Sequence, residues 1–144
     1  MITQHQIYFQ DSKNMEALES GSTVLVVTCP PYPMIEMWDA MFIDQNAEIG
    51  HALDKGDGPV AFELMHRQLD AVWQEVWRIL NQGGIACINV GDATRTINSR
   101  FRLYPSNSGQ EQSFQARLRR PALWLVPNRR GPGSLLYCCW HVLQ

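Results

Sequence analysis

Long hydrophobic runs are missing from this sequence. No apolar stretch approaches the roughly 20 residues that a membrane-spanning helix needs, and the N-terminus has neither the basic nor the apolar region of a signal peptide. A cytoplasmic location is therefore expected. The 144 residues, of which 45% are hydrophobic, suit at most one domain with a core of its own.

Paired cysteines are missing as well. The sequence has no Cys-x-x-Cys pair and no histidines at the spacing of zinc ligands, so neither a metal site nor a disulfide framework is predicted. The cysteines are expected to be reduced thiols. They are Cys29, Cys87, Cys138 and Cys139.

An excess of positive charge is also absent. The formal net charge of −2, taken alone, argues against a nucleic-acid partner, because phosphate contacts need Lys and Arg. The distribution of charge is uneven, however. From Arg95 onward there are eight arginines and a single acid, Glu111, whereas the first 94 residues hold the other thirteen acids. Either a basic side that faces DNA or a solvated basic tail explains this asymmetry.

The most informative stretch runs from Thr23 to Tyr32 and reads Thr-Val-Leu-Val-Val-Thr-Cys-Pro-Pro-Tyr. Its consecutive apolar residues predict a strand buried on both faces of a parallel sheet. The strand should end at Thr28, because Pro30 and Pro31 cannot donate backbone hydrogen bonds. The stiff loop that follows would lie just past the carboxyl end of the strand, where α/β proteins bind ligands.

A long helix and a second strand complete a β-α-β unit. Pro59 suits a first helical position, and apolar residues then recur at three- and four-residue steps as far as Leu80. Gly83-Gly84 ends this helix, and Ile85 to Val90 predicts a second buried strand. Such a crossover makes the two strands parallel, so that the residues after each strand would line one crevice.

The other segments have weaker patterns. Gln6 to Gln10 predicts a short first strand, and a helix is expected from about Lys13 to Leu18. Asp44 to Gly58 is polar and without period, so a surface loop is predicted there. His66 is expected at the surface of the long helix.

The loop after the first strand resembles the signature of one enzyme family. A strand ending in Ser, Asp or Asn and followed by Pro-Pro-Tyr is typical of DNA amino-methyltransferases, which methylate N4 of cytosine or N6 of adenine. The run from Val26 to Asp39 looks most like the cytosine-N4 branch, in which Thr-Ser-Pro-Pro-Tyr is usual, with Cys29 in place of the Ser. The Gly-Gly, strand, Gly-Asp sequence that ends at Asp92 also matches the family.

The resemblance implies a partial S-adenosylmethionine-dependent methyltransferase fold of the α/β, Rossmann-like class, with a parallel sheet and flanking helices. It implies a site-specific DNA methyltransferase that acts on the exocyclic N4 of a cytosine flipped out of double-stranded DNA, with N6 of adenine as the alternative. The cofactor would be S-adenosyl-L-methionine. A restriction endonuclease of the same restriction-modification system is an expected partner.

The resemblance also assigns residues to roles. Asp11 and Asp92 would bind the cofactor, although capping of the following helix explains Asp11 as well. Tyr32 would stack on the flipped base, while Cys29 and the carbonyl of Pro30 hold its amino hydrogens. A thiol is a weaker acceptor than a hydroxyl, so this positioning should suffer. The implied catalytic residues are Cys29, Pro30, Pro31 and Tyr32.

The resemblance covers only about residues 6 to 104. Residues 1–104 are therefore interpreted as the catalytic half of a DNA methylase domain, and residues 105–144 as an irregular or disordered tail. The abrupt loss of pattern in that tail is typical of a frameshifted or truncated reading frame. No Phe-x-Gly-x-Gly segment for the cofactor is recognisable, so weak cofactor binding by the isolated chain is expected.

Two other interpretations stay open. The chain could be an inactive remnant, or a subunit that needs a partner chain for cofactor binding. A module that presents Pro-Pro-Tyr to a WW domain is a further alternative, but it requires an exposed and flexible loop, against which the preceding strand argues.

Overall fold

The structure is a computed structural model in which residues 2–104, 124–127 and 137–142 are described. Within these residues a four-stranded sheet has the order β1-β2-β6-β5. Strand β1 pairs in parallel with β2, whereas β6 pairs antiparallel with both β2 and β5. The bounds are β1 (Thr23–Thr28), β2 (Leu80–Val90), β5 (Trp124–Pro127) and β6 (Tyr137–Val142).

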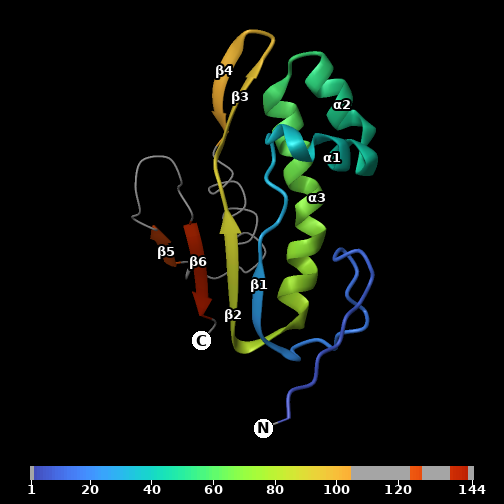
Figure 1. Cartoon of the computed structure of the whole chain (residues 1–144), viewed down its shortest axis with the longest axis vertical. Coiled ribbons are helices and arrows are strands. Elements are labelled where there is room, and N and C mark those ends of the chain that lie inside the picture. Colours follow the sequence, from blue (N-terminus) through green and yellow to red (C-terminus); the bar gives the residue numbers. More distant parts are fainter. Residues whose placement is uncertain (1, 105–123, 128–136, 143–144) are drawn as a thin grey trace.

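The predicted β-α-β unit is confirmed, but Gly83 and Gly84 lie within β2 and do not end the helix, which stops at Ile79. The long helix α3 (Gly58–Ile79) connects β1 to β2 and lies along the sheet (Figure 1). It begins where the side chain of Asp57 accepts a hydrogen bond from the backbone N–H of Val60. Its apolar face forms most of the core together with residues of β2. The core members on α3 include Ala61, Met65, Leu69, Trp73 and Val76.

The helical region between β1 and α3 is richer than the sequence analysis predicted. A short 3-10 helix, η1 (Glu36–Trp38), leads into α1 (Asp39–Gln45), and α2 (Ala47–Asp54) follows directly. The prediction of a surface loop at 44–58 is therefore wrong. Asn46 caps α2 by accepting a hydrogen bond from Glu48 N at 3.0 Å, and the buried face of α2 packs against α3.

A hairpin was not predicted between β2 and the tail. Strands β3 (Ala93–Ile97) and β4 (Arg100–Tyr104) pair antiparallel around Asn98 and Ser99, whose φ angles are 47° and 64°. Two residues of positive φ match the twist of a tight hairpin. Figure 1 shows the hairpin extending past the end of the sheet at which β1 and β2 finish.

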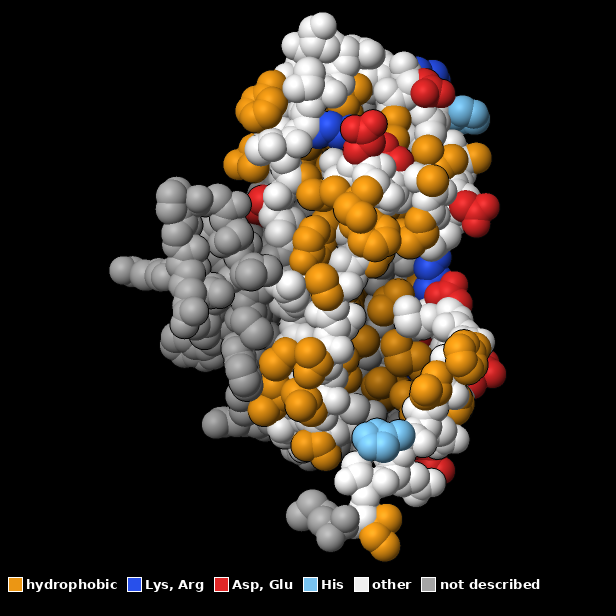
Figure 2. Space-filling model, viewed as in Figure 1, with side chains coloured by type: hydrophobic (Ala, Val, Ile, Leu, Met, Phe, Trp, Pro, Cys, Tyr) orange, Lys and Arg blue, Asp and Glu red, His pale blue; other side chains and the backbone are white. Residues whose placement is uncertain are grey.

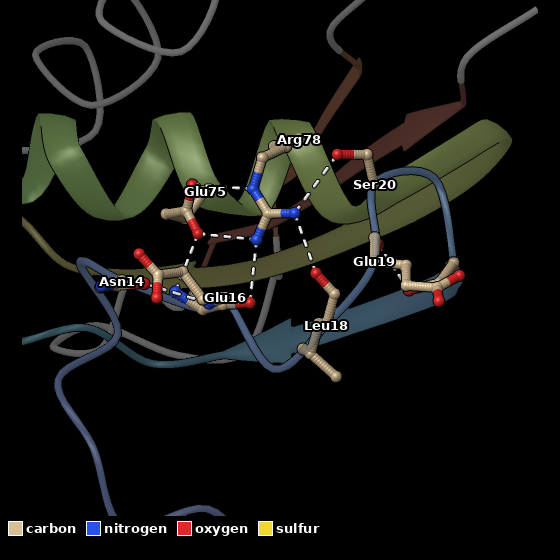
Figure 3. A network of polar contacts seen from close by, with 9 residues as sticks. Asn14, Glu16, Leu18, Glu19, Ser20, Glu75 and Arg78 are labelled. Carbon is tan, nitrogen blue, oxygen red and sulfur yellow. Dashed lines mark hydrogen bonds and ion pairs between the residues drawn. The ribbon is translucent and has the colours of Figure 1, made fainter.

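The N-terminal segment forms turns instead of the predicted strand at 6–10 and helix at 13–18, so both of those predictions are wrong. Side chains of α3 bind its backbone (Figure 3). The guanidinium of Arg78 donates to the carbonyls of Leu18 and Met15, at 2.9 Å each. The Glu75 carboxylate accepts a hydrogen bond from Met15 N at 2.8 Å.

Strand β1 is not buried on both faces, which corrects another prediction. Val24, Leu25 and Val27 are exposed to 65%, 54% and 73%. The reason is the place of β1 in the sheet, where β2 is its one paired neighbour among the described strands. Figure 2 shows hydrophobic side chains gathered on the surface over the lower part of the sheet. The position of the strand was predicted correctly, but the burial of both its faces was not.

The predicted irregular tail lies mostly outside the described residues. Of residues 105–144, the structure describes β5 and β6, and β6 joins the sheet beside β2. In the part of the chain that is described, no helix is both long and apolar enough to cross a membrane.

Candidate active site

The two strand ends bring a thiol and an amide together. Thr28 and Ile88 are register partners in the parallel pair, so the next residues, Cys29 and Asn89, are neighbours across the strands. The amide Nδ2 of Asn89 lies 3.6 Å from Cys29 Sγ, within the range of a weak hydrogen bond to sulfur. Residues 89–92 therefore meet the loop that follows β1, as the sequence analysis expected.

The ring of Tyr32 lies at the same place, where β1 and β2 end. Its hydroxyl oxygen lies 3.1 Å from Cys29 Sγ, and its ring lies against Gly91. A Cβ atom built on Gly91 would be only 3.3 Å from Cε2 of the ring. Gly91 thus permits a close approach that a larger residue would hinder, and Asp92 follows it directly. Cys29 and Tyr32 of the proline loop therefore lie beside Asn89 and Gly91, the residues that lead to Asp92.

The hydroxyl of Tyr32 keeps its proton in this setting. Burial of the side chain, followed by the hydrogen bond and the charge interaction with Cys29, raises the pKa of Tyr32 to about 12. The phenol is consequently neutral at physiological pH. It can donate a hydrogen bond to Cys29 or accept one from it.

The proline loop is held in a strained conformation. Pro30 and Pro33 are buried, and Met34 has a φ of 69°, which is unusual for a residue other than glycine. The buried side chain of Met65 accepts a hydrogen bond from Met34 N at 3.3 Å. Strained backbone that persists because its surroundings hold it is common at functional sites.

A cavity of about 310 Å³ lies beside the loop, between the N-terminal segment and helices α1 and α3. Pro31 and Asp11 both line it, whereas Asp92 does not. The carboxylate of Asp11 accepts a hydrogen bond from Lys13 N at 2.9 Å, so Asp11 caps a turn and not a helix. Among the described residues, no three metal-ligating side chains cluster.

Lys13 is a feature of this cavity that the sequence analysis missed. Its ammonium donates to the side-chain oxygens of Gln45 at 2.6 Å and Gln68 at 3.1 Å. These partners are 32 and 55 residues away in the chain, so no local pattern could have revealed them. The three side chains join the N-terminal segment to α1 and α3 at the cavity wall.

An ion pair between Arg95 and Asp39 was also missed. Two nitrogens of the guanidinium bind the two carboxylate oxygens at 2.8 and 2.6 Å, and both side chains are more than four-fifths buried. Hydrogen bonding to Asp39 raises the pKa of Arg95. The pair connects the middle of β3 to the start of α1 and so fixes the hairpin relative to the proline loop.

His66 lies in the core and not on the surface, which corrects the sequence prediction. It is only 7% exposed, and neither ring nitrogen has a hydrogen-bond partner among the described residues. Its ring packs edge-on against Phe62, with centroids 4.4 Å apart. Burial lowers the pKa of His66 to about 4, although Glu63 and Asp70 oppose this shift. A neutral histidine away from the crevice has no part in the candidate site.

Comparison with known proteins finds similarity to methyltransferases. No protein-family model matches it. It is 48% identical over 108 residues to the type II methyltransferase M.MthZI of Methanothermobacter thermautotrophicus, a match that covers 74% of the chain and 30% of that protein. It is 46% identical over 126 residues to the type II methyltransferase M.MjaI of Methanocaldococcus jannaschii, which covers 80% of the chain and 42% of that protein. The chain thus spans less than half the length of these relatives.

Solved structures show which fold the chain shares. A protein of Thermus thermophilus, assigned as a DNA modification methylase, superimposes with a TM-score of 0.54 at 23% identity, over 94% of the chain and 52% of that protein. The same protein in complex with S-adenosyl-L-methionine gives a TM-score of 0.52, over 92% of the chain and 51% of that protein. Over most of its length the chain is therefore similar to part of two type II methyltransferases, and it has the α/β fold of about half of the Thermus thermophilus protein.

Proposed function

We propose that the chain supplies the target-base part of a DNA methyltransferase that modifies the exocyclic N4 of cytosine in double-stranded DNA. The observation that carries this proposal is the crevice in which Cys29 Sγ lies 3.1 Å from the Tyr32 hydroxyl and 3.6 Å from Asn89 Nδ2. A planar base with an amino group would find here the ring of Tyr32, the acceptor Cys29 and the stiff backbone carbonyl of Pro30.

Three residues of the proline loop, Cys29, Pro30 and Tyr32, have a task in this proposal. The exocyclic amino group of a base is a poor nucleophile, because its lone pair is delocalised into the ring. Tyr32 stacks on the extruded base, and Cys29 Sγ accepts one amino hydrogen. The carbonyl of Pro30 accepts the other, and the buried proline keeps that carbonyl fixed. Together they orient the nitrogen lone pair out of the ring plane.

The cavity beside the loop fits the role of a cofactor site. Asp11 and Pro31 line the same space, so a molecule held by Asp11 would reach the proline loop. S-adenosyl-L-methionine, held there by Asp11, would supply an electrophilic methyl group for the amino nitrogen that Cys29, Pro30 and Tyr32 orient. The residues of the chain would not need to form a covalent intermediate. Asp92, at the end of β2, is the second residue proposed for this cofactor.

A specific observation favours a chain that works with a further polypeptide. Val24, Leu25 and Val27 leave the edge of β1 apolar and exposed, and an edge of this kind favours pairing with another strand. The parts of the relatives that lie outside the matched region are the natural source of that strand. We infer that the part of a type II methyltransferase that lies outside the matched region covers β1, adds further contacts to the cofactor and completes the enzyme.

A methyl-transfer assay tests this function. The purified chain is incubated with duplex DNA and labelled S-adenosyl-L-methionine, alone and with the part of M.MjaI that lies outside the match. We expect methyl incorporation only in the mixture, and nucleoside analysis should find N4-methylcytosine. N6-methyladenine would support the alternative target. No incorporation in either arrangement, or incorporation that survives Tyr32→Ala, would contradict the proposed function.

A further inference from the structure

The β3–β4 hairpin carries two arginines on one face. Arg100 and Arg102 line a cavity of about 360 Å³, whereas Phe101 and Leu103 alternate toward the opposite face and are 70% and 61% exposed. Figure 2 shows hydrophobic side chains at this end of the molecule. Charge and apolar surface are thus separated across β4, and the charge faces the cavity.

The opposite wall of this cavity comes from the turn between α2 and α3. Lys55 contributes a third cation, and the wall continues from Gly56 to Pro59. Asp57 is the single acid among the lining residues, and its carboxylate already accepts a hydrogen bond from Val60 N at 3.3 Å. The lining is therefore positive by two charges, counting three cations against one carboxylate.

Close packing sets the separation of the two walls. Gly56 has a φ of 76°, which side chains rarely adopt, and a Cβ there would clash with Asn98 in the hairpin turn. A Cβ on Gly58 would clash with the hydroxyl of Tyr104. The hairpin therefore contacts the turn at two points, so the two elements that carry the three cations are packed against each other.

The cavity lies at the end of the sheet that holds the candidate active site. The hairpin extends past the ends of β1 and β2 (Figure 1). The ion pair between Arg95 and Asp39, with its shorter contact at 2.6 Å, fixes the hairpin to the helix that follows the proline loop. A ligand of the cavity would therefore be held in a fixed relation to Tyr32.

We propose that this cavity binds backbone phosphates of the duplex DNA that presents its base to Tyr32. The proposal rests on the proposed function for its choice of ligand and adds the surface that grips the DNA. Arginine forks bind phosphate oxygens with two hydrogen bonds, and lysine adds a compact charge. Contacts of this kind fix the register of the duplex without reading its sequence.

Binding of a labelled 30-base-pair duplex to the full chain, measured by fluorescence anisotropy at several salt concentrations, tests the proposal. We expect Arg100→Gln and Arg102→Gln each to weaken binding about threefold, and together about tenfold, with Lys55→Gln adding to the loss. The slope of log affinity against log salt should become shallower by about 0.9 for each phosphate that is no longer bound. The matched control is Arg67→Gln, because Arg67 is 64% exposed on α3 and outside the cavity.

The outcomes separate this proposal from the proposed function. Unchanged affinity and salt slope in Arg100→Gln/Arg102→Gln, an equal loss in Arg67→Gln, or no binding by the parent chain would overturn the phosphate site. Tighter binding of a single-stranded RNA of equal length with the same arginine dependence would also overturn it. None of these results decides whether methyl transfer occurs. Conversely, DNA binding that depends on Arg100 and Arg102 stands even where no methyl group is transferred.

Discussion

The Sγ atom of Cys29 lies 3.1 Å from the hydroxyl oxygen of Tyr32. The ring proposed to stack on the base is thus bound to the side chain proposed to hold the amino group of that base. Asn89 approaches the same sulfur at 3.6 Å, so a target base would compete with two protein groups for one weak acceptor. The strength of that acceptor should therefore limit the reaction.

Replacing Cys29 with serine should raise the rate of methyl transfer in the completed enzyme. A hydroxyl accepts a hydrogen bond more strongly than a thiol, so the amino group should be better positioned. We expect a several-fold gain in kcat, within the roughly 10²-fold that a well-placed hydrogen bond contributes. Cys87→Ser is the control, because Cys87 is a partly buried cysteine on β2, away from the proline loop. A rate for Cys29→Ser equal to or below that of the parent would count against this role.

Adding one methyl group at Gly91 should disturb the stacking ring. The new Cβ in Gly91→Ala would lie 3.3 Å from Cε2 of Tyr32, a distance at which the ring must shift by a few tenths of an ångström. We expect methyl transfer to fall about tenfold, mainly in kcat, since small misplacements of reacting groups are costly. The control is Gly50→Ala in α2, where the nearest atom is 3.5 Å away. Full activity in Gly91→Ala would show that the ring position is unimportant.

The fold was predictable where the signal is local. Hydrophobic runs and helical spacing identified β1, α3 and β2, and the order of these elements was enough to make the strands parallel. The proline loop was also predictable, because proline restricts the backbone wherever it occurs. The crevice between Cys29 and Asn89 followed from these features and from the rule that parallel strands end at the same edge.

The rest depended on contacts between distant residues. Arg95 and Asp39 are 56 residues apart, and nothing near either residue indicates the pair. The burial of His66 depends on which side of α3 faces the rest of the core, and the exposure of β1 depends on which strands pair beside it. Asn98 did carry a signal for the hairpin, because asparagine tolerates positive φ, but this signal is weak without a glycine after it.

The ion pair between Arg95 and Asp39 should stabilise the described part of the fold. Both side chains are mostly buried, so removing one partner leaves an uncompensated charge. We expect Arg95→Gln to lower the free energy of unfolding by about 1 to 3 kcal/mol, measured by urea denaturation. Arg67→Gln is the control, because its pair with Glu63 is 64% exposed on both sides and should contribute about 0.5 kcal/mol or less. Equal losses in the two variants would argue that the hairpin is not fixed by this pair.

The buried His66 should make stability depend on pH. Its pKa is lowered from 6.5 to about 4 in the folded chain, so between these values the unfolded chain binds more protons. The free energy of unfolding is therefore highest above pH 6.5. It falls by about 2 to 3 kcal/mol as the pH drops to 4. His66→Leu should remove this dependence and leave the protein more stable than the parent at pH 5. His51→Asn, at an exposed position of α2, should retain it. Unfolding curves at pH 5 and pH 7 that shift equally for the parent and for His66→Leu would show that His66 is not the group responsible.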